Sequence, residues 1–582
     1  MAGISELASR HVDRLAALDP VMATAMGVPG HDAEMTDYSP AGLEARHALN
    51  RDTLGALSRL QPSSDAERRA AEVMRERLEV EVDQHDAGER LRDLRIFASP
   101  FSDIRECFDL MATDSEEDWE TIAARIERVP EALESFQAAL REGIDRGLVA
   151  ARRQALACVE QGLTWSGQKG APSFFRTFVA DGMGRSSGLQ ARLDRAAAAA
   201  DAAYGDAAAF LGKEYAPKAE AKDAVGRERY GVAARQFLGM DLDLDETYQW
   251  GWAELHRIED RMNQIGRQIL PDGALPAVIQ LLESEPGRSL EGEGRLRQWL
   301  QELMDRTIAE LNGKHFDIPG PIKRVEAMIA PPGGAAAMYY TAPSEDFKRP
   351  GRTWYPTMGK TRFPLWTEVS TAYHEGVPGH HLQLAQWVYL SDTLNRFQRL
   401  VAFIPGNSEG WALYAERLMG ELGYLENPDY ELGMLAGQAM RATRVVLDIG
   451  AHLELPIPKS ERYHPGERWT PELMLPFAVE HAYQPEDYMR SEVDRYLGWP
   501  GQAIAYKVGE RVWLDLREQV KAARGAAFDL KAFHVEALNL GPMGLAQLRR
   551  EFATALALGP AGVRVTGARA GDAGGPNKNR LA

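Results

Sequence analysis

Three of the chain's thirteen histidines lie within eight residues of one another in the segment TAYHEGVPGHHLQLAQ, Thr371 to Gln386. Glu375 directly follows the first of them, His374. Histidines with a neighbouring glutamate are the residue types that bind zinc and transfer protons in metallohydrolases. The spacing departs from the usual H-E-x-x-H pattern, because Pro378 stands where the second histidine would be. The segment therefore predicts a metal site with altered spacing.

A helix must place these side chains, and the sequence predicts that it begins after Thr367 as the N-cap residue. Histidines four residues apart lie on one helix face, about 6 Å apart along the axis, and can bind one zinc ion. The two later histidines follow His374 by six and seven residues instead. In an unbroken helix the first points to nearly the opposite side, and the second lies about 10 Å further along the axis.

The residues between the histidines offer a way to restore the geometry. Pro378 removes a helical hydrogen bond, and Gly379 permits unusual backbone angles, so we expect the helix to be broken or bulged there. Looping out the extra residues brings one later histidine back to the metal-facing side. We expect this to be His380, with His381 as the alternative ligand.

A zinc site needs a third protein ligand and an open position for water. The best candidate is Glu409 in the segment PGNSEGWALYAERL, which predicts a second helix with Asn407 or Ser408 as its N-cap residue. A carboxylate in the first turn would point toward the end of the preceding helix. Glu416, seven residues further on, lies on the same face and is either a hydrogen-bond partner of a ligating histidine or an exposed charge.

The chemistry of such a site assigns further roles. Zinc lowers the pKa of a bound water toward 7, and Glu375 would take its proton as general base and pass it to a leaving amine. A hydrogen-bond donor must then stabilise the oxyanion of the transition state. The late segment DRYLGWPGQAIAYKVGER is rich in donors, namely Arg495, Tyr496, Tyr506 and Lys507.

Composition limits the classes of partner. The 582 residues are enough for two or more domains or for one large multi-lobed domain. The net charge is −18, with 67 basic and 85 acidic residues. This balance argues against nucleic acid and against an anionic membrane surface as the main partner.

Cysteine content and the N-terminus predict a location. Cys107 and Cys158 are the only cysteines of the sequence, which excludes a disulfide framework. The first residues contain no apolar stretch of the kind found in secretory signals, and no apolar run is as long as a transmembrane helix. We expect a cytoplasmic protein.

Periodic apolar residues predict helices over most of the chain. Between residues 313 and 360, proline and glycine are dense, and short β-branched and aromatic segments predict a small sheet directly before the histidines. We therefore divide the chain into a helical N-terminal region (1–312) and a catalytic region of sheet and metal-binding helices (313–558). The glycine-rich tail (559–582) is predicted to be disordered.

Three strings carry a resemblance to a known family. HEGVPGHHLQ, NSEGWALYAERL and RYLGWPGQAIAYKVG together resemble the bacterial family called domain of unknown function 885, over nearly the whole chain. That family is similar, distantly, to helical zinc peptidases such as angiotensin-converting enzyme, thimet oligopeptidase and the Taq-type carboxypeptidases. The resemblance implies a mostly α, clam-like fold with a deep channel and a small sheet beside the active-site helix.

The resemblance also implies roles for individual residues. It makes His374 and Glu409 metal ligands and Glu375 the base. Aligning the chain on Gly-His selects His380 as the second ligand, whereas aligning it on the following His-x-Gln selects His381.

Two further parts of the peptidases have counterparts here. The segment Met338–Ala342 resembles the strand that binds the substrate backbone, which implies a substrate contact for Tyr340. The matching late positions are Tyr496 and Tyr506 for catalysis and Arg495 and Lys507 for substrate binding.

The expected function is therefore that of a zinc peptidase that cleaves short peptides inside a channel. One alternative is a metal-dependent hydrolase of a small-molecule amide. Another, from a different class, is a helical binding protein that kept the scaffold without the catalysis.

Overall fold

The computed structural model describes residues 3–180, 186–330 and 338–558. About 67% of the chain is helical and only a few short strands form sheets, so the prediction of a mostly α fold with a small sheet is confirmed. No helix within the described ranges is both long and apolar enough to cross a membrane. The predicted disordered tail, 559–582, lies outside the described residues.

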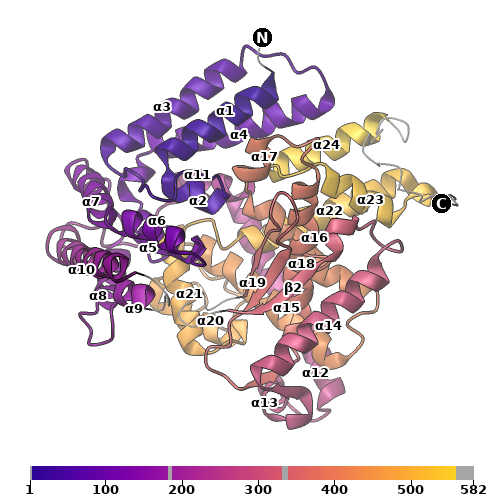
Figure 1. Ribbon diagram of the computed structural model, residues 1–582. Coiled ribbons are helices and arrows are strands. Elements are labelled where there is room, and N and C mark those ends of the chain that lie inside the picture. Colours follow the sequence, from indigo (N-terminus) through magenta and orange to yellow (C-terminus); the bar gives the residue numbers. More distant parts are fainter. Residues whose placement is uncertain (1–2, 181–185, 331–337, 559–582) are drawn as a thin grey trace, which may run out of the picture.

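The helices of the first part of the chain form the layers at the top and the left of Figure 1. Their bounds are α1 (Ile4–Leu18), α2 (Pro20–Met26), α3 (Pro40–Leu57), α4 (Asp65–Asp86), α5 (Pro100–Glu106), α6 (Glu116–Ile126), α7 (Val129–Asp145), α8 (Arg152–Trp165), α9 (Phe174–Ala180), α10 (Ser187–Phe210) and α11 (Arg227–Leu238). Helix α4 shows how local sequence fixes such bounds, because the Ser64 hydroxyl accepts the Glu67 N–H and caps its first turn.

The later helices surround the histidine segment, and α15, α16, α18 and α19 lie near the centre of the molecule (Figure 1). Their bounds are α12 (Leu244–Ile269), α13 (Leu275–Ser284), α14 (Glu293–Leu311), α15 (Glu368–Glu375), α16 (His380–Tyr389), α17 (Arg396–Leu400), α18 (Pro405–Glu421), α19 (Pro428–His452), α20 (Pro471–Ala482), α21 (Glu486–Gly498), α22 (Ala505–Arg524), α23 (Leu530–Asn539) and α24 (Leu545–Leu558).

The strands between α14 and α15 form two small sheets, one of them together with β1 (Ser289–Glu291), which precedes α14 in the chain. The larger has the order β2 (Val325–Ile329), β4 (Gly351–Tyr355), β3 (Tyr339–Thr341), with β4 parallel to β2 and antiparallel to β3. These strands lie within residues 313–360, where the sequence predicts a small sheet, and β3 and β4 contact α16. The second sheet pairs β1 (Ser289–Glu291) with β5 (Arg362–Pro364).

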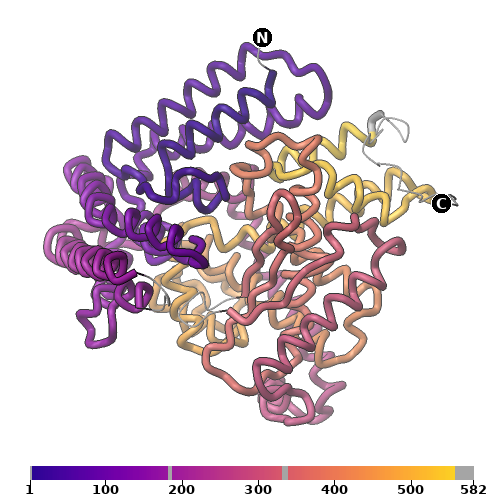
Figure 2. The backbone as a smooth tube through the Cα atoms, viewed as in Figure 1, coloured from indigo at the N-terminus to yellow at the C-terminus, as the bar shows by residue number. Residues whose placement is uncertain are grey.

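The buried apolar side chains form two clusters. The larger includes Ile4 and Phe552, so it joins both ends of the described chain, and it has members on both sides of residue 312. The smaller lies within residues 21–216. Figure 2 shows the last helix beside the first ones, where Arg68 of α4 donates two 2.8 Å hydrogen bonds to Glu551 of α24. The domain boundary at 312 stays a prediction.

Candidate metal centre

The helix that carries His374 is interrupted before the next histidine. Helix α15 starts after Thr367, as predicted, and ends at Glu375, and α16 begins at His380. The Gly379 N–H donates to the Tyr373 carbonyl (3.0 Å), so this bond spans six residues where a helical bond spans four. The backbone thus loops out two residues, and the histidine at spacing six takes the place of one at spacing four.

Glycine is required in this loop because two backbone segments meet there. A Cβ atom on Gly379 would lie 1.9 Å from the His374 carbonyl oxygen and 2.4 Å from that of Tyr373, closer than any side chain can come. The Trp411 indole N–H, from α18, donates to the Pro378 carbonyl (2.9 Å). The loop is therefore held by its own backbone and by the helix that carries the third candidate ligand.

Three donor atoms converge beside this loop. The Nε2 atoms of His374 and His380 lie 3.4 and 3.5 Å from Oε2 of Glu409. These distances are too long for good hydrogen bonds, but zinc bonds of about 2.0–2.1 Å in a tetrahedron place ligand atoms about 3.4 Å apart. Oε2 of Glu409 is buried and has no hydrogen-bond partner in the described part of the chain. The residues therefore fit a zinc ion.

Glu375 lies beside these donors. Its carboxylate and the ring nitrogens of His374 and His380 offer atoms that all lie within 4.8 Å of one another. Glu375 is 6% exposed, and its Oε2 is buried without a hydrogen-bond partner among the described residues. An unpaired, buried carboxylate next to these candidate metal ligands is placed to accept a proton.

Glu416 fixes the orientation of one histidine. His374 Nδ1–H donates to Glu416 Oε1 (2.7 Å), and the Ser370 hydroxyl donates to the other carboxylate oxygen (2.6 Å). This hydrogen bond turns Nε2 of His374 toward Glu409, as outer partners of metal ligands do. His380 has no such support within the described ranges, since its buried Nδ1 has no partner.

The electrostatics of the pocket favour a cation. Burial alone would lower the pKa of His374, but the carboxylates of Glu409 and Glu416 outweigh it and raise that pKa to about 9. Burial likewise opposes the charge on Glu409, yet His380 and His374 lower its pKa well below the usual range. The carboxylates thus require a nearby positive charge, which a proton or a metal ion can supply.

His381, the alternative second ligand, is engaged elsewhere. Its Nε2–H donates to the Ile322 carbonyl (2.7 Å), and its Nδ1 accepts from the Tyr340 hydroxyl (2.9 Å). A Cβ atom on Gly351 of β4 would lie 2.6 Å from Nδ1 of His381, so the backbone of this strand packs directly against the ring. The geometry therefore favours His380 and makes His381 the link between α16 and the sheet. The hydroxyl of Tyr340, a residue predicted to bind substrate, forms part of that link by donating to His381.

The helix that carries Glu409 begins earlier than predicted. Helix α18 starts at Pro405 with Ile404 as its N-cap residue, so the prediction of Asn407 or Ser408 in that role is wrong. The Asn407 side chain instead accepts from Gln383 of α16 (3.0 Å) and donates to the Met543 carbonyl. It serves tertiary contacts, which a local capping pattern does not reveal.

Close helix packing brings Tyr506 to the centre. A Cβ atom on Gly410 of α18 would lie 2.4 Å from the carbonyl carbon of Gly509 of α22, so only glycine permits this approach. Tyr506 lies one turn before Gly509 and is half-buried. Burial, followed by the charge of Glu409, raises the pKa of Tyr506 to about 12, which keeps its hydroxyl protonated and able to donate.

Tyr496 and Arg495 belong to a neighbouring network. The Tyr496 hydroxyl donates to Glu492 (2.7 Å) and accepts from Arg444 (3.0 Å), and the side chain is buried. Arg495 donates two hydrogen bonds to the same carboxylate, at 3.0 and 2.8 Å. Arg444 of α19 thus joins Tyr496 and Glu492 of α21, whereas the bonds of Arg495 to Glu492 stay within α21.

Lys507 is occupied by contacts with other side chains of the protein. Its ammonium group is fully buried and donates to Glu254 (2.8 Å), Gln438 (2.7 Å) and Glu510. These three bonds use all of its N–H groups, so none remains for a substrate. The predicted role in substrate binding is therefore corrected to a structural one.

Two arginines of α19 were missed by the sequence reasoning. The Arg444 guanidinium lies 4.7 Å from the centre of the Tyr506 ring, and that of Arg441 lies 5.9 Å from it. Arg441 also lies 4.0 Å from Glu416. The available signal was a pair of charges three residues apart within the apolar stretch LAGQAMRATRVVLDIG, because charge inside a buried helix needs a partner or a role.

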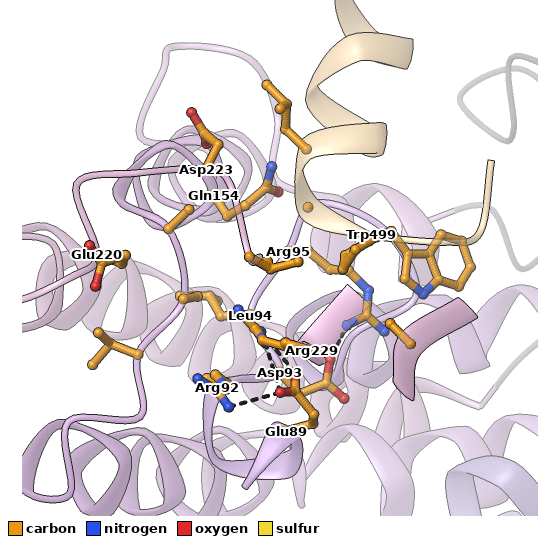
Figure 3. A pocket seen from close by; sticks show the side chains of 18 of the residues that line it. Glu89, Arg92, Asp93, Leu94, Arg95, Gln154, Glu220, Asp223, Arg229 and Trp499 are labelled. Carbon is orange, nitrogen blue, oxygen red and sulfur yellow. Dashed lines mark hydrogen bonds and ion pairs between the residues drawn. The ribbon is translucent and has the colours of Figure 1, made fainter. Parts of the chain in front are cut away.

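A different hollow lies between the N-terminal helices and the segment before α22 (Figure 3). Its charged side chains pair with one another, since Glu89 accepts from both Arg92 (2.8 Å) and Arg229 (2.7 Å). The Arg95 guanidinium lies 5.2 Å from the centre of the Trp499 ring. These charged side chains thus have partners within the chain, and none of the predicted site residues lines the hollow.

The chain is similar to a protein family over most of its length. The family described as "Bacterial protein of unknown function (DUF885)" matches residues 20–552. The chain belongs to this family. The resemblance found in the sequence is thereby confirmed, and DUF885 leaves the function open.

Two solved structures share the fold of this DUF885 member. A protein from Colwellia psychrerythraea is 23% identical with a TM-score of 0.80, and the match covers 96% of this chain and 100% of that one. A protein from Shewanella oneidensis, described as of unknown function, is 18% identical with a TM-score of 0.71, over 95% of this chain and 100% of that one. No curated protein matches the chain.

Both solved proteins are named "putative lipoprotein". This finding contradicts the predicted cytoplasmic location, which is therefore wrong. Cysteine scarcity had supported that prediction, and Cys107 and Cys158 are indeed buried and free. A core of this size, however, stabilises a fold without disulfides in any compartment, so the cysteine count does not report location here.

Proposed function

We propose that the chain is a zinc-dependent hydrolase that cleaves amide bonds of short peptides. The observation that carries the proposal is the convergence of Nε2 of His374, Nε2 of His380 and Oε2 of Glu409, with separations of 3.4 and 3.5 Å, beside Glu375. Two histidines and a carboxylate, with a further glutamate next to them, are the donor set of zinc hydrolases. A zinc ion at this place would supply Lewis-acid chemistry and an acidified water.

Glu375 is the proposed general base. In the reaction, the oxygen of a water molecule forms a bond with the amide carbonyl carbon, and the carbon–nitrogen bond breaks. Glu375 takes one proton from the water and delivers it to the leaving nitrogen, so that a carboxylic acid and an amine are released. The buried and unpaired Oε2 of Glu375 supports this role.

Tyr506 is the proposed donor to the oxyanion. It lies on α22 close to Glu409, and its raised pKa keeps the hydroxyl protonated at neutral pH. Tyr496 is less suited, because its hydroxyl is already bound to Glu492 and Arg444. Arg441 places positive charge beside Tyr506, which suits a substrate that carries a carboxylate, whereas the charge of Arg444 is already paired with Glu492 at 2.8 Å.

Burial of the donors favours small substrates over folded proteins. His374 and His380 are 3% and 8% exposed, so a folded chain cannot bring a peptide bond against them. A short peptide or a small amide can enter more easily, and peptides are preferred here because β3 lies beside α16 at the edge of its sheet, where it can pair with an extended backbone.

The test combines metal content with turnover. The purified chain is incubated with Zn²⁺, its metal is measured by elemental mass spectrometry, and cleavage of a library of short synthetic peptides is followed by mass spectrometry. Glu375→Gln should retain the zinc of the buried centre and lose about 10²- to 10⁴-fold in turnover. Glu421→Gln, on the exposed surface of α18, is the matched control.

Two results would count against the proposal. Unchanged turnover in Glu375→Gln would remove Glu375 as the base. A wild-type chain that binds peptides and zinc without cleaving any of them would support the non-catalytic binding protein instead.

A further inference from the structure

A second histidine cluster lies far from the first, between α3 and α4. These two helices pack against each other and are joined by residues 58–64, so the start of α3 lies beside the end of α4 (Figure 1). Glu44 and His47 come from the first two turns of α3, and His85 comes from the last turn of α4. Donor atoms of these three residues all lie within 4.8 Å of one another.

The separations within this cluster resemble those at the buried centre. Nε2 of His85 lies 3.4 Å from Oε2 of Glu44, and Nε2 of His47 lies 3.6 Å from Oδ1 of Asp86. Both exceed an ordinary hydrogen bond, and both are close to the roughly 3.4 Å between two ligands of a tetrahedral zinc ion. The two imidazole rings are stacked, with centroids 3.9 Å apart and an angle of 12° between them. Because an imidazole nitrogen binds a metal in the plane of its ring, the ring of His85, whose side chain is 25% exposed, must turn before both histidines can bind one ion.

His47 is the buried member of the cluster. It is 6% exposed, and its Nδ1 is buried without a hydrogen-bond partner in the described ranges. The remaining members are open to solvent, because a surface hollow of about 340 Å³ is lined by Glu44, His85 and Asp86. An ion from solution can therefore reach the cluster from the side of His85, which lines the hollow, whereas His47 lies behind it.

The charges around the rings favour metal over protons. Burial and the neighbouring His47 lower the pKa of His85, so its ring is neutral at pH 7. Neutral imidazole is the form that binds metal. Among the nearby cations, Arg90 is paired with Glu81, and Arg51 lies 3.5 Å from the other oxygen of Glu44.

We propose that Glu44, His47 and His85 form a second site for a divalent transition-metal ion of the zinc class, with Asp86 as an adjacent carboxylate. Imidazole nitrogens select such ions over magnesium and calcium, which prefer oxygen ligands. The site does not depend on the proposed hydrolase. A bound ion would join the start of α3 to the end of α4 and so stabilise the open end of this helix pair.

The test removes the buried centre and counts the metal that remains. The full chain with Glu409→Ala, free of any affinity tag, is equilibrated with Zn²⁺, desalted and measured by elemental mass spectrometry. We expect one zinc per chain to remain, and we expect zinc to raise the midpoint of thermal unfolding. Adding His85→Gln to this background should abolish both, while circular dichroism shows an unchanged helical fold.

Glu142→Gln is the matched control, since Glu142 lines the same hollow but offers no atom to the cluster. It should leave the retained zinc unchanged. The proposal is overturned if the Glu409→Ala chain keeps no zinc. It is equally overturned if the retained zinc survives both His85→Gln and Glu44→Gln, because the ion is then bound elsewhere.

Discussion

The cluster at His374 and the cluster at His85 each hold a histidine nitrogen 3.4 Å from a carboxylate oxygen, yet their surroundings differ. At the first, Glu416 holds the far side of the His374 ring, and the Trp411 indole holds the loop between the histidines. At the second, packing alone fixes His47, and the side chain of Glu44 is 57% exposed. The comparison teaches that the same donor groups can be prearranged, as at the proposed metal centre, or left adaptable at the surface, depending on the hydrogen bonds behind them.

The largest difference is expected when the carboxylate ligand is removed. Glu409→Ala should weaken zinc binding at the buried centre by more than about 100-fold, because it also leaves two histidines without their partner. Glu44→Ala should weaken the exposed site by only about tenfold, since Asp86 can take its place. Competition with a chromogenic chelator measures both, with Glu421→Ala as control. Equal losses at the two sites would contradict the comparison.

A smaller effect is expected from the partner behind the ligand. Glu416→Gln keeps the shape of the side chain but removes its charge, and should weaken zinc binding at the buried centre about 10- to 100-fold. The exposed site serves as an internal control in the same chain, because Glu416 is remote from it in the sequence and on a different helix. Unchanged binding at the buried centre would show that Glu416 does not orient His374.

The two sites should also differ in their response to pH. Because the pKa of His374 is raised to about 9, zinc must displace a proton there, and its affinity should rise about tenfold per pH unit between about pH 7 and 9. His85 has a lowered pKa and is neutral over this range, so the exposed site should change little. Chelator competition at several pH values measures both slopes. Parallel slopes would refute this prediction.

The same shift affects the stability of the metal-free chain. A folded pKa raised above the unfolded value of about 6.5 stabilises the fold fully below that pH. The contribution of His374 is then lost as the pH rises through about 9.

The smallest effect on metal is expected at the alternative histidine. His381→Gln should leave the zinc content unchanged, because both ring nitrogens of His381 are bound to Ile322 and Tyr340. The lost hydrogen bonds should reduce the free energy of unfolding by about 1–2 kcal/mol, measured by urea denaturation. His380→Gln is the matched variant and should lose the zinc. If the two variants exchanged these outcomes, His381 would be the ligand.

The parts of the site that were predictable from the sequence are those encoded locally. His374, Glu375 and His380 lie within seven residues, and Pro378 and Gly379 indicate that the helix is interrupted between the two histidines. The three strands of the larger sheet were visible for the same reason, as short β-branched and aromatic segments.

The errors arise where partners are distant in the chain. The sequence predicts a substrate-binding role for Lys507 because its neighbours in the chain do not reveal Glu254, 253 residues away. The sheet formed by β1 and β5 was missed because these strands are three residues long and, unlike the equally short β3, do not consist of aromatic and β-branched residues. Arg441 and Arg444 of α19 approach Tyr506 only because α19 packs against α22, and the sequence does not show this contact.

The looped backbone at Gly379 makes two different letter patterns equivalent in space. Deleting Val377 and Pro378 from H-E-G-V-P-G-H would leave H-E-G-G-H, which has the four-residue spacing of familiar zinc hydrolases. An insertion that would rotate the second histidine away in a continuous helix is here absorbed by the six-residue hydrogen bond from Gly379 to Tyr373. Genome searches that require a fixed spacing pass over chains built in this way, whereas searches that allow a Pro-Gly insertion between the histidines would recover them.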